Sequence, residues 1–95
     1  MTTFIMTGRY TTEAIKKITG KRTTKAHEIV KKCGGKIVSA YAMMGETDVL
    51  AVMEFSSIND AIKASVALSK ALEISFSTVP AIRLEEFDKL VGSKA

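Results

Sequence analysis

The sequence predicts an α+β fold with the element order β-α-β-β-α-β, and three observations lead to this prediction. Residues 34–55 contain two strand-like runs that fold back on each other around the turn at residues 44–47. Apolar residues recur at helical spacing both before and after this pair of strands. An alternating segment stands near each end of the chain. This order is typical of a ferredoxin-like sandwich with helices on one face of an antiparallel four-stranded sheet, in the spatial order 4-1-3-2.

The first third of the chain predicts a strand and a helix that is broken in two. Residues 3–10 alternate loosely and form the strand. Hydroxyls at residues 11–12 cap the helix, which Gly20 interrupts and which starts again near residue 23. Gly34 and Gly35 end it. The apolar residues that we expect on the inner faces of its two parts are Ala14, Ile15 and Ile18, then Ala26, Ile29, Val30 and Cys33.

The last third predicts a helix, a strand and a short closing helix. Residues 57–60 resemble a capping box and start a helix that runs to about Leu72. Its expected buried stripe is Ile58, Ala61, Ile62, Ser65, Leu68, Ser69 and Leu72. A last strand covers residues 76–84, and Pro80 places it at a sheet edge, because proline lacks the N–H that a central strand needs. Residues 85–91 form the closing helix, and residues 92–95 are expected to be a frayed tail.

Length and composition predict a single domain over residues 1–95 with a modest core. No apolar run approaches the roughly 20 residues that cross a bilayer, and the N-terminus does not resemble a signal peptide. One cysteine cannot form an internal disulfide, which fits a reducing compartment. We therefore expect a cytoplasmic protein with no membrane partner.

The two central strands are apolar or small on both of their faces, apart from a few polar positions. A sheet with helices on one side needs only one apolar face, so the second face must also be covered, most simply by a second copy of the chain. We therefore expect a homo-oligomer with a sheet-lined interior. Alternation places the following side chains on this second face: Ile5, Thr7, Arg9, Ile37, Ser39, Tyr41, Met43, Leu50, Val52, Glu54, Ser77 and Arg83.

The topology also predicts where distant polar groups meet. Strands one and two run parallel, so the end of strand one, residues 8–10, lies beside the turn at residues 45–48. This brings Arg9 near Asp48, either as an anchor for a small anionic ligand or as a cross-strand ion pair that only sets the register. The residues that we predict to bind a ligand are Arg9, Tyr10, Tyr41, Glu46 and Asp48.

Few residues indicate catalysis or metal binding. His27 is the only histidine and is predicted on a helix, away from the second sheet face. Cys33 lies at a helix C-terminus, where the dipole disfavours a thiolate, so we expect it to pack as a small hydrophobe. Tyr41 and Glu54 either line a site or take structural positions, with the Tyr41 hydroxyl bonded across an interface and Glu54 solvated at a rim. We expect no metal and no cofactor.

The net charge of +4 is unevenly distributed along the chain. Residues 1–36 carry nine Lys or Arg and two acids, whereas residues 37–95 carry five Lys or Arg and eight acids. A basic surface can bind nucleic acid, but here the lysines alternate with the apolar face of the same helices, and the chain has no Trp for base stacking. We interpret the basic residues as a solvated outer face and expect no nucleic-acid partner.

Three segments resemble the GYD domain family and together extend over nearly the whole chain: residues 5–11, with Gly8-Arg9-Tyr10-Thr11, residues 45–49, and residues 81–87. The chain departs from the family at Thr47, where a tyrosine is usual. The resemblance implies a relative of the dimeric α/β-barrel proteins, in which two ferredoxin-like sheets face each other, and it implies no particular reaction. The hairpin is also similar to the effector domain of leucine-responsive-type regulators, which bind amino acids at subunit interfaces.

We rank three functions for such a chain. The first is a small oligomeric ligand-binding or sensor module, whose site at the sheet edge or subunit interface takes a small anionic or amino-acid-like ligand. The second is a structural or protein-interaction subunit. The third is a small cofactor-independent enzyme of the dimeric-barrel type, for which Arg9, Tyr41 and Glu54 form only a thin catalytic set. Whether the chain is an enzyme stays open.

Overall fold

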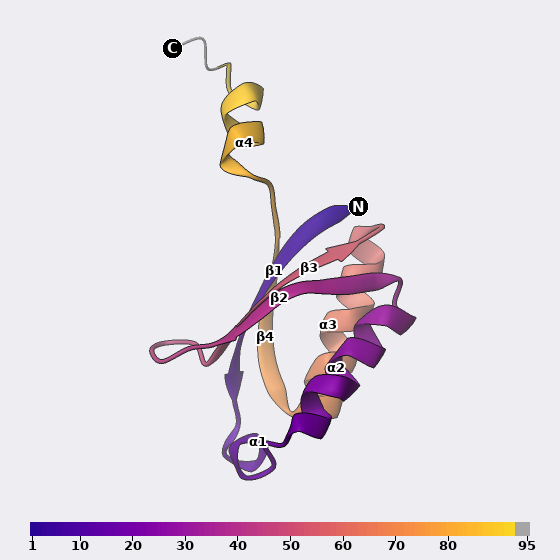
Figure 1. Cartoon of the computed structure of the whole chain (residues 1–95), viewed down its shortest axis with the longest axis vertical. Coiled ribbons are helices and arrows are strands. Elements are labelled where there is room, and N and C mark those ends of the chain that lie inside the picture. Colours follow the sequence, from indigo (N-terminus) through magenta and orange to yellow (C-terminus); the bar gives the residue numbers. More distant parts are fainter. Residues whose placement is uncertain (93–95) are drawn as a thin grey trace.

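The computed structural model describes residues 1–92 and contains one antiparallel sheet of four strands (Figure 1). The strands are β1 (Thr2–Tyr10), β2 (Gly35–Ala42), β3 (Val49–Phe55) and β4 (Ile74–Ala81). Their spatial order is β2-β3-β1-β4, which confirms the predicted order 4-1-3-2 and the ferredoxin-like α+β fold. Pro80 lies on β4, which is an edge strand as predicted.

Within residues 1–92, four helices accompany the sheet: α1 (Thr12–Lys16), α2 (Gly20–Lys32), α3 (Ile58–Leu72) and α4 (Leu84–Leu90). The two long helices, α2 and α3, lie side by side on one face of the sheet, whereas α4 projects away from the far end of β4 (Figure 1). This projection contributes to an elongated shape of 51 × 30 × 18 Å. No helix within residues 1–92 is both long and apolar enough to cross a membrane.

The core lies between the sheet and the two long helices. Phe55 is fully buried, and its ring meets that of Phe4 edge-on with centroids 5.9 Å apart. Helix α3 buries a stripe of two alanines and two leucines, which are Ala61, Ala64, Leu68 and Leu72. Ile58 and Ile62, predicted in this stripe, are more than half exposed. That part of the prediction is wrong because alanines, not the larger isoleucines, occupy the face where the helix lies closest to the sheet.

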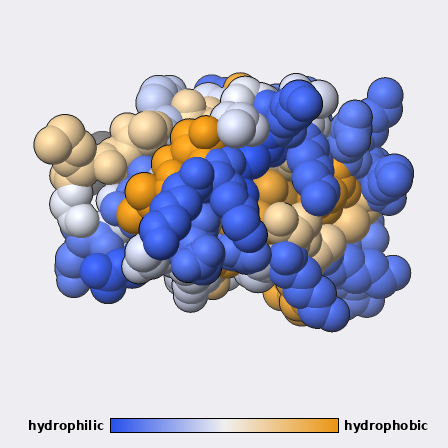
Figure 2. Space-filling model, turned by 90° about the horizontal axis from the view of Figure 1, so that it is seen from below, coloured by the Kyte–Doolittle hydropathy of each residue, from blue (hydrophilic) through white to orange (hydrophobic). Residues whose placement is uncertain are grey.

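The first helix is broken as predicted, but at a different point. Thr11 caps α1 by accepting a 3.0 Å hydrogen bond from the Ala14 N–H. The break covers residues 17–19, and Gly20 is the first residue of α2. Ile15 and Ile18, expected inside, are 56% and 55% exposed, because α1 is too short to lay them on the sheet. Hydrophobic patches lie among hydrophilic side chains at this end of the molecule (Figure 2).

A β-bulge in β2 changes which of its side chains face the helices. Ile37 pairs with Met53, but the next paired residue, Ser39, already pairs with Val52. Met53 is buried in the core, so Ile37 packs there too. The prediction that Ile37 lies on the second sheet face is therefore wrong, because the extra residue of the bulge reverses the alternation that a strict period of two assumes.

The segment around β4 also differs from the prediction. Glu73, in a left-handed conformation with φ of 56°, ends α3 and turns the chain directly into β4 at Ile74. The strand ends at Ala81, so Arg83 precedes α4 as its N-cap and does not lie on the second sheet face. Helix α4 confirms the predicted closing helix to within one residue. Of the predicted tail, residues 93–95 lie outside the described residues.

Two glycines test how tightly the sheet packs. A Cβ on Gly35 would press on the Phe55 ring and come within 2.6 Å of the Glu54 carbonyl oxygen, whereas a Cβ on Gly20 would meet nothing within 4 Å. We expect Gly35→Ala to lower the free energy of unfolding by about 1–3 kcal/mol through overpacking. Gly20→Ala, the matched control at the start of α2, should raise it by up to about 1 kcal/mol. Urea unfolding followed by circular dichroism measures both, and equal effects would contradict the packing argument.

Candidate functional site

Asp48 ties the β2–β3 turn to the end of β1. Its carboxylate Oδ2 accepts a 2.9 Å hydrogen bond from the Tyr10 N–H, and its own N–H donates to the Gly8 carbonyl at 2.8 Å. Its carbonyl accepts a further 2.8 Å bond from the Met43 N–H. The predicted meeting of this turn with the end of β1 is thus present in the structure. The backbone pairing of β1 with β3 ends at Gly8 and Val49. Beyond this pair, the Asp48 carboxylate accepts the hydrogen bond of the Tyr10 N–H in place of a backbone carbonyl.

Arg9 and Tyr10 point to opposite sides of the sheet, as neighbours on a strand must. Arg9 is exposed and pairs in register with Ser75 of β4. Tyr10 is partly buried and packs against the core beneath the helices. Of the ion pairs formed within residues 1–92, none joins Arg9 to Asp48. The predicted binding residues therefore do not converge on one point in a single chain.

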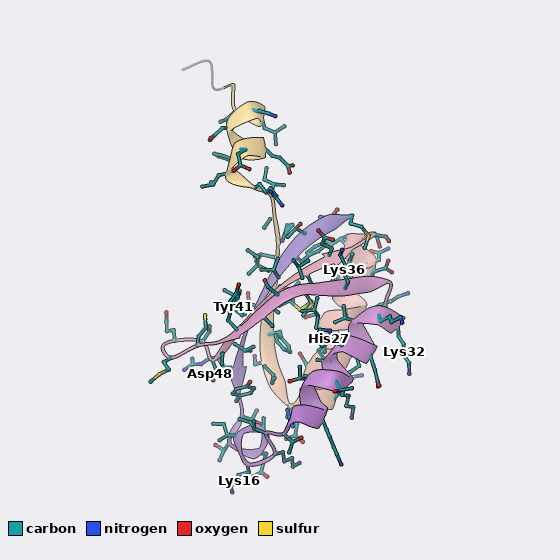
Figure 3. All side chains as sticks on the ribbon, viewed as in Figure 1. Lys16, His27, Lys32, Lys36, Tyr41 and Asp48 are labelled. Atoms are coloured by element: carbon teal, nitrogen blue, oxygen red, sulfur yellow. The ribbon has the colours of Figure 1, made fainter. Side chains whose placement is uncertain are left out.

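The remaining polar residues of the prediction lie on β2, on β3 and in the turn between them. Tyr41 is 59% exposed and pairs with Leu50, and Glu46 is exposed in the turn (Figure 3 labels Tyr41 and Asp48). Glu54 forms an ion pair with Lys36, with 3.5 Å between Oε1 and Nζ. The Glu54 side chain is 30% exposed in the single chain.

The sheet face opposite α2 and α3, here called the open face, has an apolar centre and a polar border. Strand register places Ile5, Val52 and Val79 side by side in one row. The next row contains Ser77, Thr7, Leu50 and Tyr41. None of these side chains is buried in the single chain. A row of three aliphatic residues on neighbouring strands is the most hydrophobic part of this face.

The other side of the sheet contains a cavity of about 130 Å³, here called the α2 groove. Its walls are mainly apolar and include Ala26, Ala40, Ala51, Leu72, Ile74 and Phe76. Its polar lining residues are Tyr10, Arg22, Thr23 and His27. Figure 3 shows His27 on the side of α2 toward the sheet. His27 lies away from the open face as predicted, but it borders this second space.

Sequence reasoning missed the α2 groove and its residues Arg22 and Thr23. One available signal was helical spacing, because Arg22 and Ala26, like Thr23 and His27, are four residues apart and share a helix face. The second signal is the pairing of two small residues, Ala40 and Ala51, beneath that helix face. This pairing can be recognised only when the register of the strands is known. Within residues 1–92, no group of three His, Cys, Asp or Glu side chains is placed to hold a metal ion.

This architecture defines a class of small α+β proteins with one helix-covered and one bare sheet face. The chain belongs to the GYD domain family, whose model matches residues 4–91. No curated protein matches the chain.

Solved structures with the same fold include the following three. The leucine response regulatory protein LrpA of Mycobacterium tuberculosis matches with a TM-score of 0.63 and 7% identity, over 86% of this chain and 51% of that one. An AsnC family transcriptional regulator from Agrobacterium tumefaciens matches with a TM-score of 0.58 and 18% identity, over 86% of this chain and 50% of that one. The protein TTHA0845 from Thermus thermophilus matches with a TM-score of 0.55 and 18% identity, over 87% of this chain and 95% of that one. The chain therefore spans about half the length of the two regulators, and identities this low show the fold alone.

The Asp48 contacts lead to a prediction about stability. Asp48→Ala leaves the partly buried Tyr10 N–H without its carboxylate acceptor, so we expect the free energy of unfolding to fall by about 1.5–3 kcal/mol. Asp48→Asn keeps an acceptor oxygen and should lose less. Glu46→Ala, in the same turn and exposed, is the control and should change stability by no more than about 0.5 kcal/mol. Chemical unfolding measures all three variants. An Asp48→Ala protein as stable as the control would contradict the structural role.

Proposed function

We propose that the chain is a small-molecule-binding or sensor module that works as a homo-oligomer, with two copies facing each other across their open faces as a dimeric α/β barrel. The observation that carries this proposal is the open face itself. In its aliphatic row, Ile5 and Val52 are partly exposed to water and Val79 is exposed in the single chain, although burying them would be favourable. A second copy offers a matching apolar surface, because a two-fold interface is complementary to itself.

The proposed ligand site lies at the border of this interface. Arg9 supplies a guanidinium that can hold a carboxylate through paired hydrogen bonds. Tyr41 supplies a phenol on the same face, and Glu46 supplies an exposed carboxylate in the neighbouring turn that can pair with an ammonium group. Asp48 and the Tyr10 backbone hold this turn against β1. Such a set of groups suits a small anionic or amino-acid-like ligand and requires no cofactor.

The structural comparisons indicate which ligands to try first. One of the proteins with this fold is named a leucine response regulatory protein, and another an AsnC family transcriptional regulator. These names describe those proteins, and the shared part is the fold. They make free amino acids a reasonable first panel of compounds for this chain.

A second candidate function, a protein-interaction subunit, is favoured by α4. This helix has no buried residue, and Leu84, Phe87 and Leu90 are all about half exposed or more. Exposed apolar residues on one projecting helix are typical of a contact with another chain. Native mass spectrometry separates the two functions, because a module should retain a small molecule of reproducible mass, whereas an interaction subunit should give an oligomer without one.

The oligomer is tested with two valines that have the same exposure. Val79 on the open face and Val66 on α3 are each 49% exposed in the single chain. We expect Val79→Lys to shift the native mass distribution from oligomer to monomer, because it places an ammonium group in the apolar row. Val66→Lys should leave the distribution unchanged. A monomeric wild-type protein, or two variants that associate like the wild type, would contradict the proposed interface.

The ligand site is tested by thermal unfolding in the presence of the common amino acids and small carboxylic acids. A compound that binds the folded state at one hundred times its Kd stabilises it by about 2.7 kcal/mol, which raises Tm by roughly 10–20 °C for a domain of this size. We expect Arg9→Gln to abolish that rise. Lys16→Gln, which removes an exposed charge on α1, should keep it. Equal rises in both variants would exclude Arg9 from the site.

A further inference from the structure

The α2 groove carries an inference that is independent of the sheet-edge site and of the oligomer. It lies on the helix side of the sheet, opposite the face that carries Arg9. The paired alanines Ala40 and Ala51 form part of its wall, and their small side chains leave space that larger residues would fill. Ala40 is exposed even though its side chain faces the helix layer, so the cavity is open to solvent.

The size of the groove sets the size of its ligand. Its volume is about 130 Å³, and a cavity of about 150 Å³ in another protein holds benzene. A ligand of about six non-hydrogen atoms therefore fits. The walls contributed by Leu72, Ile74 and Phe76 suit an apolar tail.

The polar residues of the groove set the charge of its ligand. Arg22 is half-buried, and its Nη2 donates a hydrogen bond to the Leu72 carbonyl at the end of α3. This contact orients the guanidinium and uses only one of its five N–H donors. The Tyr10 hydroxyl and the His27 imidazole can each donate a further hydrogen bond. These groups match a carboxylate.

The groove also disfavours a positive charge. None of its lining residues is acidic, and the exposed Lys21 and Lys25 stand nearby on the outer face of α2. An ammonium group in this space would find no acidic lining residue to pair with and would be repelled by the Arg22 guanidinium. The groove therefore distinguishes a simple carboxylate from the amino acid with the same carbon skeleton.

We infer that the α2 groove is a binding site for a small apolar monocarboxylate, with Arg22 as its anchor and with selectivity against α-amino acids. The sheet-edge site proposed above has the opposite preference, because Glu46 there can pair with an ammonium group. The two sites are thus distinguished both by position and by ligand chemistry.

The test is a titration of the full-length protein with isobutyrate, followed by two-dimensional amide NMR. We expect saturable shifts at the amides of Ala26, Ala40 and Ala51. Isobutyramide, which lacks the charge, and 2-aminoisobutyrate, which adds an ammonium group, should each bind at least about tenfold more weakly, the ratio expected for loss of one charge-assisted hydrogen bond.

Two pairs of variants locate the site. Arg22→Gln should weaken isobutyrate binding at least about tenfold, whereas Lys21→Gln, on the neighbouring outer position, should change it by less than about twofold. Because Arg22 also bonds to the Leu72 carbonyl, Ala40→Leu provides a second test that leaves Arg22 in place and fills the groove. It should abolish binding, and Ala42→Leu, two residues along the same strand and outside the lining, should not.

Several results would overturn the inference. These are no saturable shift with isobutyrate, equal binding of isobutyramide, or unchanged binding in both Arg22→Gln and Ala40→Leu. Shifts confined to the amides of Arg9 and Asp48 would place the carboxylate at the sheet edge, which would support the proposed function and exclude the groove. A thermal stabilisation by Ala40→Leu in a protein that binds none of the three compounds would show that the groove is only a gap in packing.

Discussion

Two helices on one face of four strands are the constraint from which the other features of this structure follow. Because α2 and α3 lie on the same side of the sheet (Figure 1), one sheet face is covered and the other is left bare. The aliphatic row lies on this bare face, where the proposed second copy would pack. On the covered side, the helices do not fully shield β2, so Ala40 and Ala42 stay exposed beneath them. The open face and the α2 groove thus have the same origin.

The Asp48 contacts couple this framework to the proposed sheet-edge site. The turn that carries Glu46 lies at the tip of a hairpin, and the Asp48 carboxylate and N–H hold it against the last residues of β1. The same strand end presents Arg9 on the open face. Any ligand that contacts both Arg9 and the turn would therefore meet groups whose separation is set by backbone hydrogen bonds, which lowers the ordering cost of binding.

The order and type of the elements could be predicted from the sequence because periodicity and caps are local signals, as Thr11 and Gly34 illustrate. The errors arise where tertiary packing or a strand irregularity overrides the local sequence pattern. The bulge in β2 reverses the side of Ile37, and α3 approaches the sheet through alanines, which leaves Ile58 and Ile62 outside.

The predicted site joined Arg9 and Tyr10 because their segment meets the turn. Adjacent residues of a strand face opposite ways, however, so Tyr10 belongs to the α2 groove. Finding that groove required the pairing of Ala40 with Ala51, which no local pattern contains.

The two outer strands each contain an irregularity, and together these limit how copies of the chain can join. Strand β2 carries its bulge between Ile37 and Ser39, and β4 carries Pro80, which has no N–H to offer. A regular, unpaired strand edge is a template on which further strands add, and both irregularities interrupt that template. Lateral growth into a continuous sheet shared by many molecules is thereby disfavoured at both borders. Both borders of the sheet therefore resist the edge-to-edge addition of strands by which fibres grow.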